Sequence, residues 1–455
     1  MSAPLEVAIL AAGKGTRMHS ERPKVLQDLG GKALLEHVLD CAKRIGADAT
    51  HVVYGHGGDD VPDSFPSTGV NWICQSEQLG TGHAVMQVLP HTAPDAIVVV
   101  MYGDVPLISA RTLQALAEAA ADSLAILTVE LDDPQGYGRI IRDSDGQIMR
   151  IVEQRDATAT ELAIREVNTG FIVAPAARLR DWLARTNNDN AQGEYYLTDV
   201  VGLAVADGIR ISDRQPADRW EVLGVNSKSE LAKLERKYQQ QQAERLMSQG
   251  VTLRDPNRID IRGEVVAGRD CVIDVNVVLE GKVTLADGVT VGPNNFIRDS
   301  NIGPGVAVLP NCVIEEANIA QGCRIGPFSR IRPGTELGPG VNIGNFVETK
   351  NSKIAAGSKV NHLSYVGDSD VGRDVNIGAG VITCNYDGAN KHRTQIEDGV
   401  FVGSDCQLVA PVKIGESATI GAGSTIVKDV PAGGLTFSRA KQRTVSGWQR
   451  PKKGK

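Results

Sequence analysis

The strongest constraint on this chain is a six-residue repeat of aliphatic side chains that runs through its C-terminal half. A period of six matches neither the helical period of about 3.6 residues nor the alternation of a simple β-strand. It matches the hexapeptide repeat of a parallel β-helix, in which each hexad forms one short strand and a corner and turns one aliphatic side chain inward. The unbroken run is Ile396, Val402, Leu408, Ile414, Ile420 and Ile426.

The same repeat extends upstream, with five-residue steps between its segments. It is lost between Cys384 and Thr394, which predicts a loop inserted into one coil. We therefore predict a left-handed parallel β-helix of about 180 residues, with roughly ten coils stacked about 4.8 Å apart. Chance alternation in another kind of β domain is the alternative, and the length of the run argues against it. The upstream positions are Ile261, Ala267, Ile273, Leu279, Leu285, Val291, Ile297, Ile302, Val308, Ile314, Ile319, Ile325, Ile331, Leu337, Ile343, Ile354, Val360, Val366, Val371 and Ile377.

Residues 1–226 have the pattern of an α/β domain. Apolar runs at Val7–Leu10, His51–Tyr54 and Ile97–Met101 predict buried strands, and helical spacing begins at Leu34 and continues to Ile45. This alternation predicts a Rossmann-like, mostly parallel sheet that binds its ligands at the carboxyl ends of the strands.

Residues 227–250 predict one linking helix between that domain and the β-helix domain of residues 251–455. Ser227 and Glu230 form a capping box, and Gly250 is a typical C-terminal stop. A helix of about 22 residues is roughly 33 Å long. Its apolar stripe consists of Leu231, Leu234, Tyr238 and Leu246.

Composition excludes several classes of protein. The net charge of −7 argues against nucleic acid as the main partner, and no apolar run has the length of a membrane span. The seven cysteines form no C-x-x-C pair, and their odd number argues against a disulfide framework. We expect no signal peptide and a cytoplasmic location. The basic end is expected to be a disordered tail rather than a docking site, and it contains Arg450, Lys452, Lys453 and Lys455.

The first chemical motif is the glycine-rich stretch Leu10–Arg17, followed by Pro23 and Lys24. It follows a predicted strand, so its backbone N–H groups can face a phosphate chain. It is not a P-loop, because no Gly-Lys-Ser/Thr ends it, and Met18 replaces the third glycine of a dinucleotide fingerprint. The cations Arg17 and Lys24 favour a phosphate site over a tight turn with surface charges.

The second motif is Tyr102-Gly103-Asp104, at the end of a predicted central strand. A carboxylate at this position can hold Mg²⁺, which prefers oxygen ligands. The alternative is an aspartate that starts a turn before Pro106, and the neighbouring phosphate loop favours the metal. Asn226 is either a second oxygen ligand or a helix-entry residue.

A third cluster interrupts the β-helix repeat with polar residues. Arg332 and Lys350 are 18 residues apart, which is about one coil, so the two cations are expected to stack about 4.8 Å apart. Like charges gain nothing from such a placement, and an anion such as a sugar phosphate explains it better. His362 lies within one coil of both. A histidine can accept a proton near neutral pH, so we favour a general base over a structural histidine.

These motifs together resemble those of the sugar-1-phosphate nucleotidyltransferases. With the β-helix attached, nearly the full chain resembles one bacterial family, the bifunctional N-acetylglucosamine-1-phosphate uridylyltransferases / glucosamine-1-phosphate acetyltransferases. The resemblance implies synthesis of UDP-N-acetylglucosamine, a precursor of peptidoglycan and lipopolysaccharide, from glucosamine 1-phosphate, acetyl-CoA and UTP. The motifs are Leu10–Met18 with Pro23–Lys24, Gln78–Gly82, Tyr102–Asp104, Glu166–Gly170 and Gly224–Asn226.

The resemblance also implies roles for residues of the first half. Arg17, Lys24 and Mg²⁺ would offset the repulsion between phosphates when a sugar 1-phosphate attacks the α-phosphorus of UTP. Asp104 and Asn226 would bind the Mg²⁺. The uridine and the sugar would be held by Leu10, Ala11, Ala12, Gly13, Lys24, Gln75, Gly80, Thr81, Tyr102, Gly103, Asp104, Gly138, Glu153, Asn168 and Asn226.

In the second half, the resemblance implies that His362 deprotonates the amine of glucosamine 1-phosphate, which then attacks acetyl-CoA. Glu348 is a weaker candidate for orienting His362. The amino sugar phosphate would be bound by Arg332, Lys350, Tyr365 and Asn376, and acetyl-CoA by Ala379, Asn385, Tyr386, Ser404, Ala422 and Arg439. The family forms homotrimers with these sites between subunits.

Two other functions remain open from the sequence. One is a nucleotidyltransferase for another sugar or base with a regulatory β-helix. The position of His362 beside two cations argues against this function. The other is a trimeric scaffold with inactive sites, in which Arg17, Lys24 and Asp104 would be dispensable.

Overall fold

The computed structural model describes residues 3–55, 58–66, 69–120 and 123–451. The chain forms two compact units, Met1–Tyr238 and Gln239–Lys455, so the division falls inside the predicted linking helix. Lys452, Lys453 and Lys455 of the predicted basic tail lie outside the described residues.

The first unit is built on a nine-stranded sheet with a seven-strand path in the order β11-β7-β10-β6-β1-β4-β5. Strand β1 pairs in parallel with β4 and β6, and β10 is antiparallel to β6 and β7, so the sheet is mostly parallel as predicted. The strands are β1 (Leu5–Leu10), β4 (Ala49–Tyr54), β5 (Asn71–Cys74), β6 (Ile97–Tyr102), β7 (Leu124–Glu130), β10 (Glu166–Pro175) and β11 (Ile211–Arg214), with the hairpin β8 (Arg139–Arg142) and β9 (Ile148–Val152) beside β10.

Apolar cores cover both faces of this sheet, because alternate residues of each central strand point in opposite directions. Val7 and Ile9 of β1 belong to one core, and Ala8 and Leu10 belong to the other. Helices α1 (Leu34–Arg44) and α4 (Ala110–Ala120) pack on the first core. Helices α3 (Thr81–Val88), α6 (Ala176–Ala184) and α7 (Asp199–Ala206) pack on the second.

Helix α8 (Lys228–Ser248) is the predicted linking helix. The capping box is present, because Glu230 N donates to Ser227 Oγ and the Glu230 carboxylate accepts from Ser227 N. The predicted stripe serves two cores. Leu234 is buried in a core of the first unit, whereas Leu246 is buried in the core of the second. No described helix is long and apolar enough to cross a membrane.

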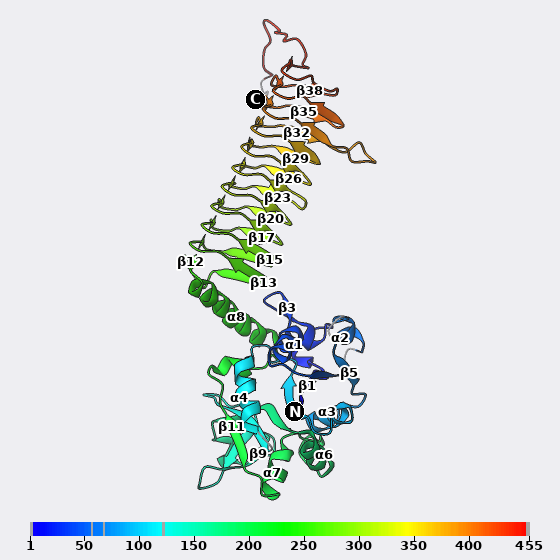
Figure 1. Cartoon of the computed structure of the whole chain (residues 1–455), viewed down its shortest axis with the longest axis vertical. Coiled ribbons are helices and arrows are strands. Elements are labelled where there is room, and N and C mark those ends of the chain that lie inside the picture. Colours follow the sequence, from blue (N-terminus) through cyan, green and yellow to red (C-terminus); the bar gives the residue numbers. More distant parts are fainter. Residues whose placement is uncertain (1–2, 56–57, 67–68, 121–122, 452–455) are drawn as a thin grey trace. The chain divides into compact units, whose positions relative to one another are not determined.

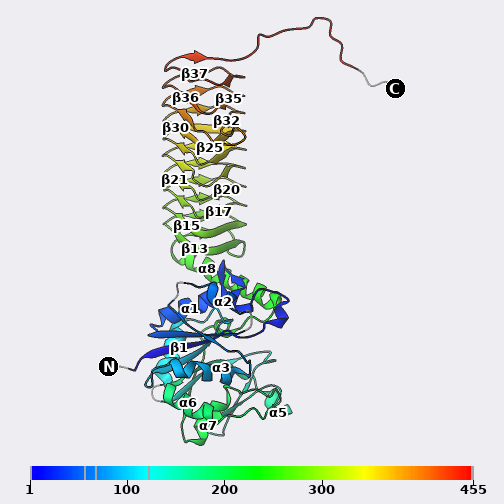
Figure 2. The same ribbon diagram turned by 90° about the vertical axis from the view of Figure 1, so that its right-hand side faces the viewer.

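The second unit is a parallel β-helix, shown as a stack of coils in Figures 1 and 2. Its strands form three faces, and the long strands β13 (Ile259–Ala267) and β15 (Val277–Leu285) run across the first two. Face A contains β17 (Phe296–Arg298), β20 (Val313–Glu315), β23 (Arg330–Ile331), β26 (Glu348–Lys350), β29 (Tyr365–Gly367), β32 (Ile382–Cys384), β35 (Gln407–Val409) and β38 (Thr425–Ile426). Face B contains β18 (Asn301–Ile302), β21 (Asn318–Ile319), β24 (Glu336–Leu337), β27 (Lys353–Ile354), β30 (Ser369–Val371), β33 (Thr394–Ile396) and β36 (Val412–Ile414). Face C is the eleven-stranded sheet β12 (Thr252–Leu253), β14 (Val272–Ile273), β16 (Thr290–Val291), β19 (Ala307–Val308), β22 (Arg324–Ile325), β25 (Asn342–Asn345), β28 (Lys359–His362), β31 (Asn376–Ile377), β34 (Phe401–Val402), β37 (Thr419–Ile420) and β39 (Leu435–Thr436).

The aliphatic repeat forms the interior of this β-helix. Its predicted members are buried in one continuous core, except Ala267, which packs partly buried against it. Burying one such side chain contributes roughly 1.5–3 kcal/mol, so the stack is stabilised coil by coil. Thr349 and Thr383 occupy inward positions where the aliphatic repeat fails, and both are buried. The predicted inserted loop leaves the stack between β32 and β33.

Candidate active sites

The first candidate site is a pocket of about 430 Å³ in the first unit. It opens where β1 and β6 end and α3 begins, which is the predicted position for a ligand of a parallel sheet. Ten of the predicted nucleotide residues line it: Leu10, Ala11, Ala12, Gly13, Lys24, Gln75, Gly80, Thr81, Tyr102 and Asp104.

The glycine-rich loop brings Lys24 into this pocket. Gly15 has φ 57°, and a Cβ on it would stand 2.8 Å from the Cβ of Lys24, so only glycine allows this close packing. Gly13 has open space beside it, which leaves room for a ligand against the backbone. Arg17 is exposed and does not belong to the pocket wall.

The two predicted metal ligands meet at one ammonium group. Lys24 Nζ forms an ion pair with Asp104 Oδ2 and lies 3.5 Å from Asn226 Oδ1. The main chain holds Asp104 in place, since Val225 N donates to the Asp104 carbonyl at 3.0 Å. The structure therefore brings together Asp104 and Asn226, which are 122 residues apart in the chain (226 minus 104).

The predicted sugar residues form a second group around the hairpin β8–β9. Asn168 N donates to the Gly138 carbonyl at 2.9 Å, and a Cβ on Gly138 would stand 3.4 Å from Glu153 Oε1. Thr198 Oγ1 donates to Glu153 Oε1 at 2.9 Å. Burial raises the pKa of Glu153, and the nearby carboxylate of Asp199 acts in the same direction.

Five residues of the pocket wall are absent from the predicted set: the apolar Val25 and Ala84, and the polar Lys14, Gln78 and Glu194. Gln78 and Lys14 lie within the motifs that drew attention to the loop and the base site, so the sequence offered a signal for them. Glu194 gave none, because it reaches the pocket from a distant segment that packs its main chain against Gly80.

The second candidate site lies on the β-helix around His362. The ring Nδ1 of His362 is 2.9 Å from Asn345 Oδ1, and the two residues are paired in register on β28 and β25. With the amide oxygen as acceptor, Nδ1 carries the proton and Nε2 keeps its lone pair. Nε2 is then the ring atom that is able to accept a proton, and the His362 side chain is exposed.

Four of the six predicted acetyl-CoA residues form a column that continues from His362. Strand register aligns Val360, Ile377, Val402 and Ile420 from coil to coil. Two residues after each of these stands His362, Ala379, Ser404 or Ala422, so all four share one edge of face C. Arg439 reaches the end of this column, where its Nη1 donates to the Ala422 carbonyl at 3.0 Å.

Three cations gather on the same coils. Arg332 follows β23 directly and Lys350 ends β26, and the register of these strands places the two residues one above the other. Lys391 from the inserted loop approaches Lys350, and this contact is the first cause that lowers the pKa of Lys350, with burial and Arg332 acting in the same direction. Sequence reasoning missed Lys391, because loop conformation rather than spacing brings it to the site.

Glu348 has a different partner from the one expected. Its Oε1 accepts a hydrogen bond from Arg332 Nη1 at 2.7 Å, and the hydrogen-bond partner of His362 is Asn345. The hypothesis that Glu348 orients His362 is therefore wrong, and Asn345 has that position.

The other predicted sugar and cofactor residues are distributed over two faces. Tyr365 on face A accepts a hydrogen bond from Asn385 of the inserted loop, and Tyr386 of the same loop is exposed. Asn376 lies on face C, so the structure does not place it on the same face as Arg332 and Lys350. A ligand that contacts the whole predicted set must span two faces.

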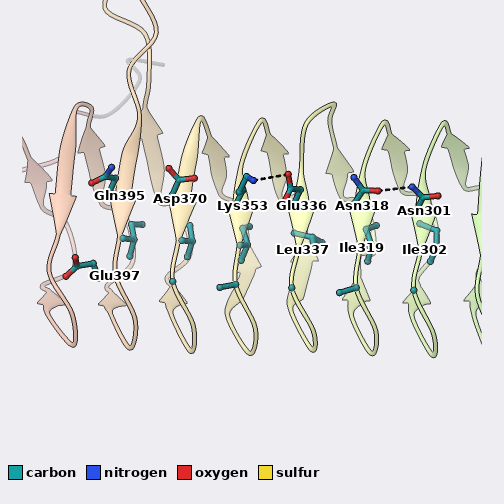
Figure 3. Close-up of a pocket in the computed structure, with 18 of the residues that line it drawn as sticks. Asn301, Ile302, Asn318, Ile319, Glu336, Leu337, Lys353, Asp370, Gln395 and Glu397 are labelled. Atoms are coloured by element: carbon teal, nitrogen blue, oxygen red, sulfur yellow. Dashed lines mark hydrogen bonds and ion pairs between the residues drawn. The ribbon is translucent and has the colours of Figure 1, made fainter.

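A larger groove of about 900 Å³ runs along face B (Figure 3). Several of its polar side chains pair with one another, including Lys353 with Glu336 at 3.1 Å and Asn301 with Asn318 at 2.8 Å. His362, Arg332 and Lys350 lie on other faces. We assign no chemistry to this groove.

Comparisons with known proteins also divide the chain into an N-terminal and a C-terminal part. Residues 7–253 match the family model of the MobA-like NTP transferase domain, and residues 316–351 and 393–428 match the bacterial transferase hexapeptide repeats. The chain is 60% identical over 450 residues to the bifunctional protein GlmU of Azoarcus sp. (strain BH72), covering 99% of this chain and all of that protein. It is 57% identical to the protein of the same name from Aromatoleum aromaticum and 55% identical to that from Marinobacter nauticus, each over 99% of both chains.

The fold and the two sites thus define a nucleotidyltransferase unit joined to a hexapeptide-repeat transferase unit. The similarity over the full length identifies one family within this class of protein. The chain belongs to the family of the bifunctional proteins GlmU, and the family predicted from the sequence is confirmed.

Proposed function

We propose that the chain carries out two consecutive reactions, one in each unit. It is a bifunctional enzyme of UDP-N-acetylglucosamine synthesis. The β-helix unit transfers the acetyl group of acetyl-CoA to the amine of glucosamine 1-phosphate. The first unit then joins N-acetylglucosamine 1-phosphate to the uridylyl group of UTP and releases pyrophosphate. The observation that carries the acetyl-transfer half is an exposed His362, oriented by Asn345, on coils that also hold three cations.

In the acetyl-transfer step, Nε2 of His362 accepts a proton from the substrate ammonium, and the free amine attacks the thioester carbonyl. The tetrahedral intermediate then collapses with loss of the CoA thiolate, which takes up the proton that the newly acylated nitrogen releases. Arg332, Lys350 and Lys391 hold the sugar phosphate at a distance from the histidine set by the coil spacing. Ser404 stands on the column two coils beyond His362, where acetyl-CoA would lie.

In the uridylyl-transfer step, no general base is required, because the attacking phosphate oxygen is already an anion. The main chain of Ala11–Gly13 and the Lys24 ammonium receive the phosphates of UTP, and exposed Arg17 would approach them from the loop. Gln75 and the Gly80 main chain contact the base. Gly138, Glu153 and Asn168 contact the N-acetyl sugar. These assignments rest on the grouping of these residues around one pocket and the neighbouring hairpin.

Mg²⁺ is the proposed metal of the first unit. The residues fit it, since a carboxylate and an amide oxygen converge on one cationic group, and Mg²⁺ prefers oxygen ligands with substrate phosphates completing its shell. Asp104 and Asn226 would hold it. When bound, it neutralises charge that develops on the phosphates of the transfer step.

A homotrimer is the proposed assembly. Phe328, Phe346 and Leu363 form an apolar ridge on successive coils beside His362, and each is at least half exposed with φ between 49° and 56°. Bulky residues in this left-handed conformation are strained, and other coils place Asn, Asp or Gly at the same corner. Burial against a neighbouring copy explains why large apolar residues stand there. Light scattering should give three times the chain mass of 48.4 kDa, and a monomer would overturn this assembly.

Seven free cysteines support the proposal that the chain works in a reducing cytoplasm.

The experiment that tests uridylyl transfer by the first unit is Asp104→Asn, assayed with UTP, N-acetylglucosamine 1-phosphate and Mg²⁺. Pyrophosphate release should fall at least about a hundredfold, while acetyl transfer by the same preparation stays unchanged. Undiminished pyrophosphate release by Asp104→Asn would reject Asp104 as part of this site, and no release by the wild-type protein would favour a scaffold function.

A further inference from the structure

The place proposed for the metal in the first unit is held by a side chain of the protein itself. Lys24 Nζ pairs with Asp104 Oδ2 and lies 3.5 Å from Asn226 Oδ1. The Lys24 and Asp104 side chains are each only 14% exposed, so the pair is shielded from water. Lys24 therefore contacts both oxygen groups that the metal would need.

An ammonium group and a divalent cation cannot share these two ligands. Like charges about 4 Å apart repel strongly wherever water is partly excluded. Lys24 also lines the nucleotide pocket, so a short swing of its side chain moves the ammonium toward the phosphates of a bound nucleotide. The close packing of Gly15 against the Lys24 Cβ anchors the base of that side chain while its end moves.

We infer that Lys24 is a resident cation that holds Asp104 and Asn226 in the metal-free enzyme, and that metal entry displaces its ammonium from Asp104 toward the nucleotide phosphates. This inference rests on the proposed magnesium site. Before metal arrives, the ammonium keeps a shielded carboxylate paired, which avoids the cost of an unpaired charge. After the exchange, the same ammonium serves the substrate. Lys24 thus pairs first with Asp104 and then with the nucleotide phosphates. Metal binding frees the ammonium for the phosphates, and phosphate binding draws the ammonium away from the metal ligands, so each binding event favours the other.

The test measures metal affinity directly, without turnover. Mn²⁺, a spin-active substitute for Mg²⁺, is titrated into the full-length protein without nucleotide, and free Mn²⁺ is followed by electron paramagnetic resonance. Lys24→Met removes the competing ammonium, so Mn²⁺ should bind about tenfold more tightly than to the wild type. Lys14→Met is the matched control, because Lys14 lines the same pocket but belongs to no ion pair with Asp104 among the described residues. It should change Mn²⁺ affinity less than about twofold.

Equal Mn²⁺ affinity in Lys24→Met and the wild type would show that the ammonium of Lys24 does not compete with the metal. The same increase in Mn²⁺ affinity in Lys14→Met as in Lys24→Met would also overturn the inference, because loss of any positive charge in the pocket would then explain the effect. Failure of the metal site itself gives a different result. If Asp104→Asn does not weaken Mn²⁺ binding in the Lys24→Met background, Asp104 is not a ligand and the proposed site is wrong. Circular dichroism spectra of each variant exclude unfolding as a cause.

Discussion

Asn345 offers the sharpest test of the acetyl-transfer site, because it acts through His362 without being expected to touch the substrate. Its amide oxygen lies 2.9 Å from His362 Nδ1. A hydrogen bond of this kind contributes about 1 kcal/mol, which corresponds to about fivefold in rate. Replacing Asn345 by Ala should therefore lower kcat for acetyl transfer about fivefold to tenfold. The KM for glucosamine 1-phosphate should change little, since the cations that hold the phosphate remain.

Asn345→Asp separates an orienting role from a merely structural one. A carboxylate about 5 Å from the centre of the His362 ring stabilises the imidazolium by about 0.8 kcal/mol in a water-like dielectric, because both side chains are solvent-accessible. The protonated ring then persists to higher pH, so the acid limb of the kcat profile should move up by about 0.6 pH unit. The assay is thiol release from acetyl-CoA, measured between about pH 5.5 and 9.

Uridylyl transfer by the same preparations is the control, and it should match the wild type in both variants. An unmoved acid limb in Asn345→Asp, combined with full activity in Asn345→Ala, would refute the orienting role. A parallel loss of both activities would instead indicate a folding defect.

Three further predictions follow from the two sites. Lys391→Met should raise the KM for glucosamine 1-phosphate about fivefold with a smaller change in kcat, as measured by initial rates, because one of the three cations around the phosphate is lost. Burial raises the pKa of Glu153 above its usual 4.5. Between 4.5 and this raised pKa the native state keeps a proton that the unfolded chain has released, so the free energy of unfolding falls as pH rises through that range. Glu153→Gln should therefore raise Tm at about pH 8 and leave it nearly unchanged at about pH 4, as measured by calorimetry. Exposed Cys74, next to the pocket residue Gln75, should react first with a thiol reagent and be protected by UTP, whereas burial raises the pKa of Cys41 to about 11 and should keep it unreactive.

The sequence predicted the β-helix well because one rule governs every coil. Each hexad must bury one aliphatic side chain against its neighbours, so the sequence of a β-helix has a six-residue period that distinguishes it from α-helices and simple β-strands. The rule failed only where Thr349 and Thr383 take inward positions. Thr349 Oγ1 lies within hydrogen-bonding distance of Thr335, and Thr383 Oγ1 accepts from Gly367 N, so both hydroxyls have a partner inside the coil.

The candidate sites were predicted less completely, and for a physical reason. Motifs identify residues that approach a ligand along one segment, such as the loop at Gly13. The 18-residue spacing predicted that Arg332 stacks on Lys350, but neither signal gave the partner of His362, which lies 17 residues away on the preceding coil. Asn345 became visible only when the register placed it opposite His362, and Lys391 only when the inserted loop folded back on Lys350. Glu348 was assigned to the wrong partner because its place in the sequence does not show that its carboxylate meets Arg332 rather than His362.

Acetyl transfer by the β-helix unit is tested most simply by thiol release from acetyl-CoA on addition of glucosamine 1-phosphate, with UTP absent. We expect thiol release by the wild-type protein and its loss in His362→Ala, whose uridylyl transfer should persist. No release by folded wild-type protein, or undiminished release by His362→Ala, would contradict the assignment of acetyl transfer to the β-helix and to His362.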